Sequence, residues 1–125
     1  MNKEFILYEQ ALALKELGFN EPCIATYDED ENFELQDFEQ NYDTFPSHII
    51  AVPLYSQAFR WFREKYVLDS IVQPTYSTKY QYRVFNIETK SKVQVYGDYM
   101  GKEFNIYEEA ELACLKKLIE IVKNK

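Results

Sequence analysis

Carboxylates are concentrated in one part of this chain. No Lys or Arg occurs between Lys15 and Arg60, yet that segment holds ten acidic side chains: Glu16, Glu21, Asp28, Glu29, Asp30, Glu31, Glu34, Asp37, Glu39 and Asp43. The formal charge of −7 therefore divides into −10 on this segment and +3 on the remainder. Like charges at this density repel one another, and folding must offset that repulsion. The segment is expected to be either a solvated acidic loop or a surface that binds a positively charged partner.

Residues 28–39 partly match the spacing of a calcium-binding loop. Oxygen-bearing side chains stand at its first, third and fifth positions, and Glu39 stands at the twelfth. The sixth position needs the positive φ that glycine adopts, but Phe33 occupies it. The preceding residues also have the character of a strand and not of an entering helix. We therefore predict an acidic hairpin turn, and we assign no metal ligands.

The remaining chemistry-bearing side chains are few. His48 is the single histidine, and its place before an apolar stretch indicates a loop or the start of a strand. Cys23 and Cys114 form no spaced motif, so we expect two buried free thiols. No glycine-rich phosphate loop and no nucleophile elbow occurs, and no two carboxylates stand out as acid and base. The sequence thus predicts a protein that is not an enzyme and needs no cofactor.

Composition limits the class further. With 46% apolar residues and only three Gly, the 125-residue chain can bury a core, and we predict one domain over residues 1–125. A pI near 4.8 argues against direct binding to nucleic acid. No apolar run approaches the roughly 18 residues that cross a bilayer, and the first residues enter a charged helix. We expect a cytoplasmic protein without membrane contact.

Three helices are predicted from apolar spacing. The first covers residues 4–17 and ends at Gly18; the second covers 54–66, with Trp61 on its apolar face as a core residue. The third begins at Asn105, which forms a capping box with Glu108. Two apolar side chains of this last helix, Leu112 and Ile119, lie off its main core face. They predict either a second neighbour within the chain or a subunit contact in a homodimer.

Two hairpins are predicted between these helices. Residues 22–27 have strand character, and 33–35 return as their partner across the acidic turn. Residues 36–47 show no clear period and indicate a loop anchored by Phe38, Tyr42 and Phe45. Residues 78–88 alternate, with Tyr80, Tyr82 and Val84 on one side, and 93–96 return as a second strand after a turn at 89–92.

Three stretches resemble a group of short proteins encoded by phages and prophages of gut Bacteroidetes, including crAss-like phages. They are residues 8–19 (YEQALALKELGF), 57–66 (QAFRWFREKY) and 107–115 (YEEAELACL), of which the central one is the most specific. The group has no assigned activity, so the resemblance supplies no functional residues. It implies a small phage accessory protein that acts in the cytoplasm of a bacterial host cell.

The sequence thus predicts an α+β fold, with three helices packed against a small, mostly antiparallel β-sheet. We expect a non-enzymatic protein-binding module that mimics nucleic acid and inhibits a bacterial or phage protein with a basic surface. The partner-binding residues would be Asp28, Glu29, Asp30, Glu31, Glu34, Asp37 and Glu39. The alternative is a small-ligand or nucleotide-binding protein, or a minor enzyme, that uses a Tyr-rich pocket on the strands.

Overall fold

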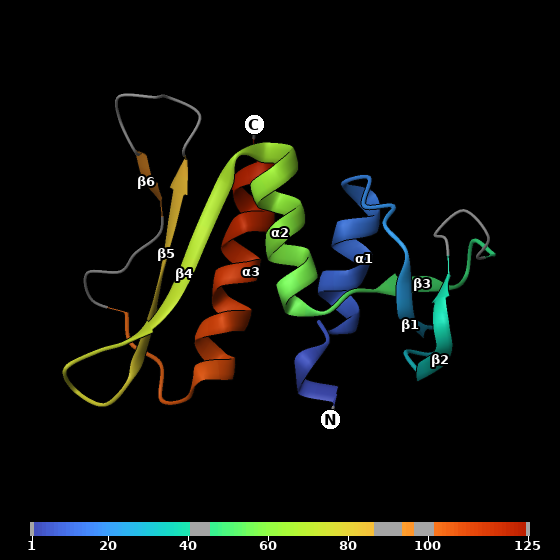
Figure 1. The fold of residues 1–125 in the computed structure, drawn as a ribbon, viewed down its shortest axis with the longest axis horizontal. Helices are drawn as coiled ribbons and strands as arrows, with labels where there is room; N and C mark the ends of the chain where they lie inside the picture. The colour runs from blue at the N-terminus through green and yellow to red at the C-terminus, as the bar shows by residue number, and fades with distance from the viewer. Residues whose placement is uncertain (1, 41–45, 87–93, 97–101, 125) are drawn as a thin grey trace. The chain divides into compact units, whose positions relative to one another are not determined.

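The chain divides into two compact units, residues 1–56 and 57–125. The computed structural model describes residues 2–40, 46–86, 94–96 and 102–124. Within these ranges three α-helices and six strands confirm the α+β class (Figure 1), and the strands form two three-stranded sheets where we expected one. The N-terminal unit contains twelve acidic and two basic side chains, a formal charge of −10, whereas the C-terminal unit carries +3. The charge asymmetry of the sequence therefore coincides with the division into units.

The first helix begins later than predicted. A short 3₁₀ turn covers Asn2–Glu4, and α1 covers Tyr8–Glu16. Between them Phe5 forms a β-bridge with Leu54, and the Ile6 N–H donates to the Pro53 carbonyl at 3.2 Å. The prediction of a helix from residue 4 is wrong because this pairing with a distant segment holds the backbone extended.

The end of α1 agrees with the prediction. Gly18 has φ of 98°, a left-handed conformation that costs glycine little. Its N–H donates to Lys15 O, and the Phe19 N–H donates to Leu14 O at 2.9 Å. These two bonds form a Schellman cap, and the buried side chains of Leu14 and Phe19 provide the apolar contact that accompanies it.

The N-terminal sheet places one strand at its centre. Its order is β2 (Phe33–Gln40), β1 (Cys23–Tyr27) and β3 (Ile50–Val52), and both pairs are antiparallel. The β1–β2 hairpin is confirmed. Since β2 extends to Gln40, the prediction of a loop over residues 36–47 is wrong for residues 36–40. Phe38 is 69% exposed and does not anchor this segment. Tyr42, Asp43 and Phe45 lie outside the described residues.

Aromatic rings cover the interior of the N-terminal unit between α1 and the sheet. Phe5 contacts Phe33 edge to face at 5.2 Å between ring centroids, and Tyr27 contacts both Phe33 and Tyr8 at 5.6 Å. Edge-to-face contacts of this kind stabilise by about 0.5–1.5 kcal/mol beyond the area that they bury. The Tyr27 hydroxyl donates to Ile6 O at 3.2 Å, which fixes the extended residues before α1 against β1.

The C-terminal unit has a sheet of order β4 (Leu68–Pro74), β5 (Tyr80–Asn86) and β6 (Gln94–Tyr96), all antiparallel. The β5–β6 hairpin was predicted, although its turn at 89–92 lies outside the described residues. Strand β4 was not predicted. Helix α3 (Tyr107–Lys123) packs on β4 and β5, and Leu68, Tyr82 and Val84 are buried. The predicted alternation of β5 is thereby confirmed.

The start of α3 differs from the prediction. Its N-cap residue is Ile106, whose side chain makes no capping bond. The Glu109 carboxylate, and not that of Glu108, reaches back to accept from the Asn105 N–H at 3.3 Å. The predicted capping box between Asn105 and Glu108 is therefore wrong by one residue, because the first helical residue is Tyr107.

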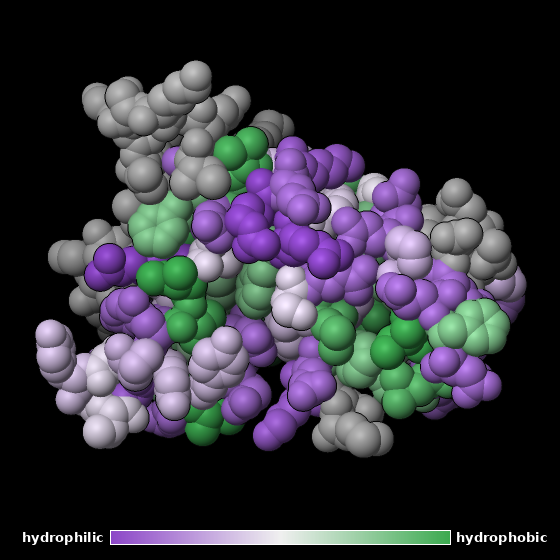
Figure 2. Space-filling model, viewed as in Figure 1, coloured by the Kyte–Doolittle hydropathy of each residue, from purple (hydrophilic) through white to green (hydrophobic). Residues whose placement is uncertain are grey.

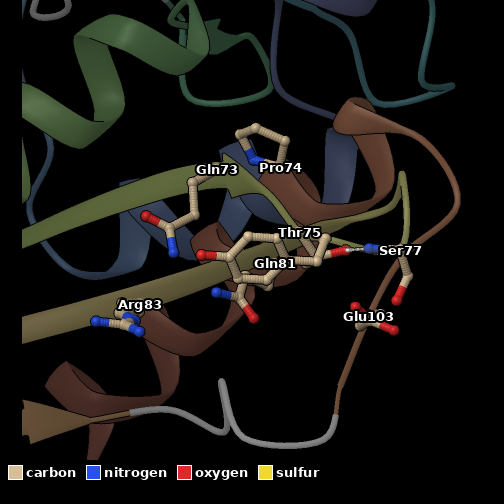
Figure 3. A pocket seen from close by; sticks show the side chains of 8 residues that line it. Gln73, Pro74, Thr75, Ser77, Gln81, Arg83 and Glu103 are labelled. Atoms are coloured by element: carbon tan, nitrogen blue, oxygen red, sulfur yellow. Dashed lines mark hydrogen bonds between the residues drawn. The ribbon is translucent and has the colours of Figure 1, made fainter.

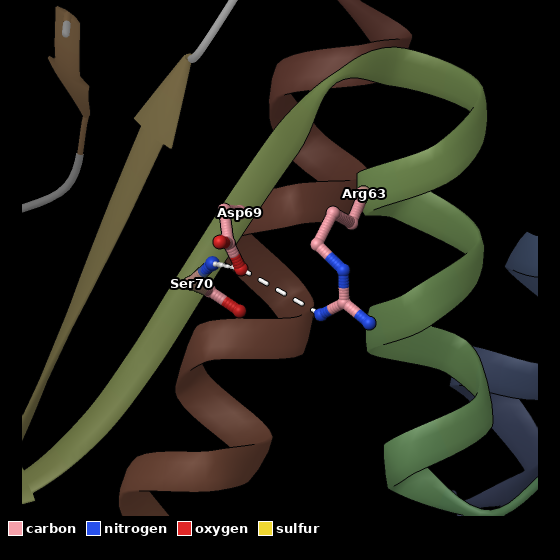
Figure 4. A network of polar contacts seen from close by, with 3 residues as sticks. All are labelled: Arg63, Asp69 and Ser70. Carbon is pink, nitrogen blue, oxygen red and sulfur yellow. Dashed lines mark hydrogen bonds and ion pairs between the residues drawn. The ribbon is translucent and has the colours of Figure 1, made fainter.

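Helix α2 (Tyr55–Tyr66) is amphipathic, as predicted. Phe62 is fully buried and Trp61 is 5% exposed, which confirms Trp61 as a core residue. On the polar side an Arg63 guanidinium nitrogen lies 3.7 Å from Asp69 Oδ1, which also accepts from the Ser70 N–H at 2.8 Å (Figure 4). Since both charged side chains of the ion pair are more than 40% exposed, it stabilises by at most about 1 kcal/mol.

We expect Trp61→Ala to lower the free energy of unfolding by about 3–5 kcal/mol, because it removes a large buried ring and leaves a cavity. Urea denaturation followed by far-UV circular dichroism measures this. Glu64→Ala, on the exposed side of the same helix, is the matched control and should stay within about 0.5 kcal/mol of wild type. Equal destabilisation by both substitutions would contradict the core position of Trp61.

Candidate protein-binding site on the acidic hairpin

The β1–β2 hairpin brings the predicted partner-binding residues together. Its turn follows Tyr27 and closes with two backbone bonds: Asp28 N–H to Asn32 O at 3.1 Å and Glu31 N–H to Asp28 O at 3.0 Å. Glu31 has φ of 65°, so the loop is a type I turn followed by a left-handed residue, a common three-residue hairpin connection. The expected acidic hairpin turn is confirmed.

Asp28 has a structural role within this turn. Its Oδ1 accepts from the backbone N–H groups of Asp30 and Asn32, both at 2.9 Å, and its Oδ2 accepts from Asn32 Nδ2 at 3.1 Å. The bonds from Asn32, more than the bond from Asp30 and the nearby His48, lower the pKa of Asp28 below its ordinary value of 3.8. Asp28 is thus occupied by the hairpin itself and is less available to a partner than its neighbours.

The other six predicted carboxylates face solvent. Within the described residues none of them makes an ion pair, and all are exposed: Glu29, Asp30, Glu31, Glu34, Asp37 and Glu39. The only basic side chains of the N-terminal unit are Lys3 and Lys15, and Lys15 Nζ donates to Ser47 O at 2.8 Å. The negative charge of the hairpin is therefore not neutralised inside its own unit.

Strand β2 is an edge strand and carries a large bulge. Cys23 pairs with Gln40 and Ala25 pairs with Leu35, so that four residues of β2 stand opposite one residue of β1. The bulge is closed by a bond from Gln40 Nε2 to Gln36 Oε1 at 3.3 Å. It exposes Phe38 between the carboxylates of Asp37 and Glu39. In Figure 2 apolar and hydrophilic side chains lie next to one another over β1 and β2.

Metal chemistry finds no support in this geometry. Among the residues that the structure describes, no group of three His, Cys, Asp or Glu side chains is placed to hold an ion. Both carboxylate oxygens of Asp28, the first residue of the calcium-like spacing, accept hydrogen bonds from the turn. His48 is exposed in the turn that precedes β3, the position expected from the sequence.

Burial raises the pKa of two thiols and of one carboxyl. The pKa of Cys23 and of Cys114 is raised to about 12, which favours the protonated thiol, and neither cysteine forms a disulfide, as predicted. Burial and the nearby Glu108 raise the pKa of Glu111 on α3 to about 7. A carboxyl that titrates near neutrality suits general acid–base chemistry. Glu111 lines neither the hollow at the β4–β5 turn nor the hollow at the start of α1.

Leu112 and Ile119 do not form one exposed patch. Ile119 is buried within the chain at 7% exposure, and Leu112 is half-buried. The sequence predicted either a second neighbour within the chain or a subunit contact, and a neighbour within the chain accounts for the burial of Ile119. A subunit contact through these residues stays a prediction.

The C-terminal unit contains a hollow that suits the alternative function. It has a volume of about 790 Å³ at the β4–β5 turn, and most of the residues that line it carry polar groups (Figure 3): Gln73, Pro74, Thr75, Tyr76, Ser77, Gln81, Arg83 and Glu103. Since Gln73 pairs with Gln81, both share one face of the sheet with Arg83. Tyr80 and Tyr82 lie on the opposite face, where Tyr80 contacts Tyr107 and Tyr82 contacts Phe104. The hollow contains one tyrosine and is not the Tyr-rich pocket that we expected.

A second hollow, at the start of α1, was not predicted from the sequence. It brings Gln10 of α1 together with Tyr27 and Glu31 of the hairpin. The apolar spacing of α1 gave no reason to expect a buried glutamine, and the pairing of Tyr8 with Tyr27 depends on how α1 meets the sheet.

Comparison with known proteins adds no assignment. No family model matches the chain, and no match is found among curated proteins or solved structures. In the part of the chain that the structure describes, no helix has the length and apolar character that crossing a bilayer requires.

We expect Asp28→Ala to lower the melting temperature, because three donors of the turn lose their acceptor. Glu29→Ala, next along the chain, removes an exposed carboxylate and serves as the control, with a melting temperature unchanged from wild type.

The folded pKa of Asp28 is depressed, so the stabilisation by its carboxylate is present above the ordinary value of 3.8 and is lost as the pH falls through the folded pKa. The difference between wild type and Asp28→Ala should therefore shrink on acidification below about pH 4. Thermal melts at pH 7 and at pH 2–3 measure this, and a difference that grows on acidification would contradict the role of Asp28.

Proposed function

We propose that this protein is a non-enzymatic binding module whose acidic hairpin occupies a basic, nucleic-acid-binding surface of another protein. The observation that supports the proposal is the set of six exposed carboxylates on one hairpin, with no ion pair to any described residue. Unneutralised charge of one sign favours association with a surface of the opposite sign and speeds the encounter.

The charge density of the hairpin supports mimicry of a phosphate backbone. An extended strand rises about 3.3 Å per residue, so the three carboxylates of β2 correspond to about one charge per 9 Å, and three more carboxylates lie in the turn that precedes the strand. One strand of DNA carries about one charge per 3.4 Å of helix axis. Strand β2 thus has roughly two-fifths of the linear charge of a nucleic-acid strand, and the turn adds to it, which favours attraction that depends strongly on salt.

The edge position of β2 agrees with this binding role and also with the simplest alternative, in which the carboxylates only keep the protein soluble. Edge strands with charges and bulges avoid pairing with other chains, so the carboxylates could serve solubility alone. Phe38 distinguishes the two explanations, because a strand that only resists association gains nothing from a ring that is 69% exposed. An exposed aromatic ring within a polar rim is typical of the centre of a binding surface.

The resemblance to phage-encoded proteins supplies the setting of the proposal. In that setting the protein acts in the cytoplasm of a gut Bacteroidetes host, and its target is a host or phage protein that binds nucleic acid. The absence of a basic cluster on the N-terminal unit, which carries −10, argues that the protein does not bind nucleic acid itself.

A second candidate is a small-ligand or nucleotide-binding protein that uses the hollow at the β4–β5 turn. The volume of about 790 Å³ is large enough for a small ligand such as a nucleotide. The lining side chains of Gln73, Gln81 and Arg83 offer donors, and Arg83 would favour an anionic group.

Charge neutralisation on the hairpin tests the first proposal. The variant combines Glu29→Gln, Asp30→Asn and Glu34→Gln and leaves the turn residue Asp28 intact. Wild type and variant are immobilised, exposed to lysate of a gut Bacteroidetes bacterium, and washed with increasing salt. We expect wild type to retain a basic nucleic-acid-binding protein, to release it between about 0.1 and 0.5 M salt as the charges are screened, and to release it to added duplex DNA.

A charge-matched control separates this site from general acidity. It combines Glu64→Gln, Glu103→Gln and Glu108→Gln in the C-terminal unit, and it changes the net charge by the same amount. The control should retain the partner, and the hairpin variant should lose it. If both variants retain the same proteins as wild type, or if DNA displaces nothing, the proposal is wrong.

A further inference from the structure

A small hollow adjoins the acidic hairpin within the N-terminal unit. Its volume is about 440 Å³, and it lies where the first turn of α1 meets the end of β1 and the hairpin turn. The residues that line it are Leu7, Tyr8, Glu9, Gln10, Tyr27 and Glu31. The hollow therefore combines an amide, two phenol rings and two carboxylates.

Gln10 forms part of the wall of this hollow. Its side chain is 93% buried, and its Oε1 has no hydrogen-bond partner among the residues that the structure describes. A buried amide oxygen without a donor is unfavourable, and such groups are rare in folded proteins. Because that oxygen has almost no accessible surface, a ligand in the hollow would meet the rings and carboxylates of the lining and not the oxygen itself.

The two tyrosines give the first indication that this hollow takes a ligand. Their ring centroids are 5.6 Å apart and the ring planes are nearly perpendicular, at 83°. Both side chains are only half-buried, so parts of their rings face the hollow. Aromatic faces attract cations such as guanidinium and ammonium groups.

Charge decides between a cationic and an anionic ligand. The N-terminus of a helix alone would favour an anion. Here, however, Glu9 already lies in the first turn of α1, and Glu31 adds a second carboxylate, which with burial raises the pKa of Tyr27. Two exposed carboxylates and no basic residue in the lining make the hollow attractive to a cation.

We propose that this hollow binds the guanidinium group of an arginine side chain. Arginine suits it better than lysine, because the planar guanidinium stacks on aromatic rings and offers five donors to acceptors in different directions. The exposed carboxylates of Glu9 and Glu31 provide such acceptors beside the two rings. The inference rests on the proposed function, since the arginine would belong to the basic partner. It adds one specific contact to the general electrostatic attraction between the acidic hairpin and that partner.

The probe is N-acetyl-L-argininamide, titrated into the full chain labelled with nitrogen-15. The uncharged isostere N-acetyl-L-citrullinamide is the control ligand. We expect saturable shifts of the backbone amide signals of Tyr8, Gln10, Tyr27 and Glu31 with the arginine compound, and no saturable shifts with the citrulline compound.

Substitutions locate the binding. Glu31→Gln and Tyr8→Ala should each weaken it by about two- to fivefold, as expected for one ion pair and one cation–aromatic contact. Glu29→Gln removes an equal charge from the same hairpin outside the hollow and should weaken it less than Glu31→Gln does. The proposal is overturned if the citrulline compound binds equally, if the shifts lie elsewhere, or if Glu29→Gln and Glu31→Gln have the same effect.

The outcome can be separated from that of the hairpin experiment. The carboxylates neutralised there, Glu29, Asp30 and Glu34, do not line this hollow. Loss of argininamide binding with intact partner capture would overturn the guanidinium site alone. Saturable argininamide binding without partner capture would support the site and overturn the proposed function.

Discussion

Electrostatic repulsion within the N-terminal unit is the constraint on which its structure depends. Twelve carboxylates and two amines occupy 56 residues, so most negative charges have no partner nearby. Two like charges 4 Å apart repel by about 1 kcal/mol in water, but by about 4 kcal/mol at the effective dielectric of a protein surface. The fold meets this constraint by holding six carboxylates of the hairpin in solvent and by giving Asp28 three hydrogen-bond donors. The uncharged strands β1 and β3 take the buried positions.

The same arrangement creates the candidate site. Because β1 pairs on both edges, β2 is an edge strand, and its bulge exposes Asp37, Phe38 and Glu39 to solvent. The turn that closes the hairpin places Glu31 beside the start of α1, where Gln10 and two tyrosines leave a hollow. The diffuse acidic surface and the proposed cation site are therefore neighbours on one hairpin. Long-range attraction would bring a basic partner near, and a single anchored side chain would fix its orientation.

The C-terminal unit has a different physical character. Its sheet buries Leu68, Tyr82 and Val84, and α3 packs on β4 and β5 with Leu115 and Leu118 buried. Its formal charge of +3 comes from side chains of both signs, including the exposed pairs Arg63–Asp69 and Lys117–Glu120. This mixture is what a solvated surface normally shows. The contrast with the N-terminal unit strengthens the interpretation that the acidic hairpin has a binding role.

The sequence by itself determined the features that depend on neighbouring residues. Local spacing and residue type predict the acidic turn, the helix stop at Gly18, the apolar face of α2 with Trp61, the alternation of β5 and the buried thiols.

Tertiary structure decided the features that depend on distant segments. Phe5 is extended because Leu54 pairs with it, and β4 is a strand because β5 offers it a complete edge. The exposure of Phe38, the burial of Ile119 and the hollow around Gln10 also arise only when separate elements meet. Local periodicity reports which side of an element is apolar, but it does not report which segment covers that side, and hydrogen bonding and burial between distant segments decide this.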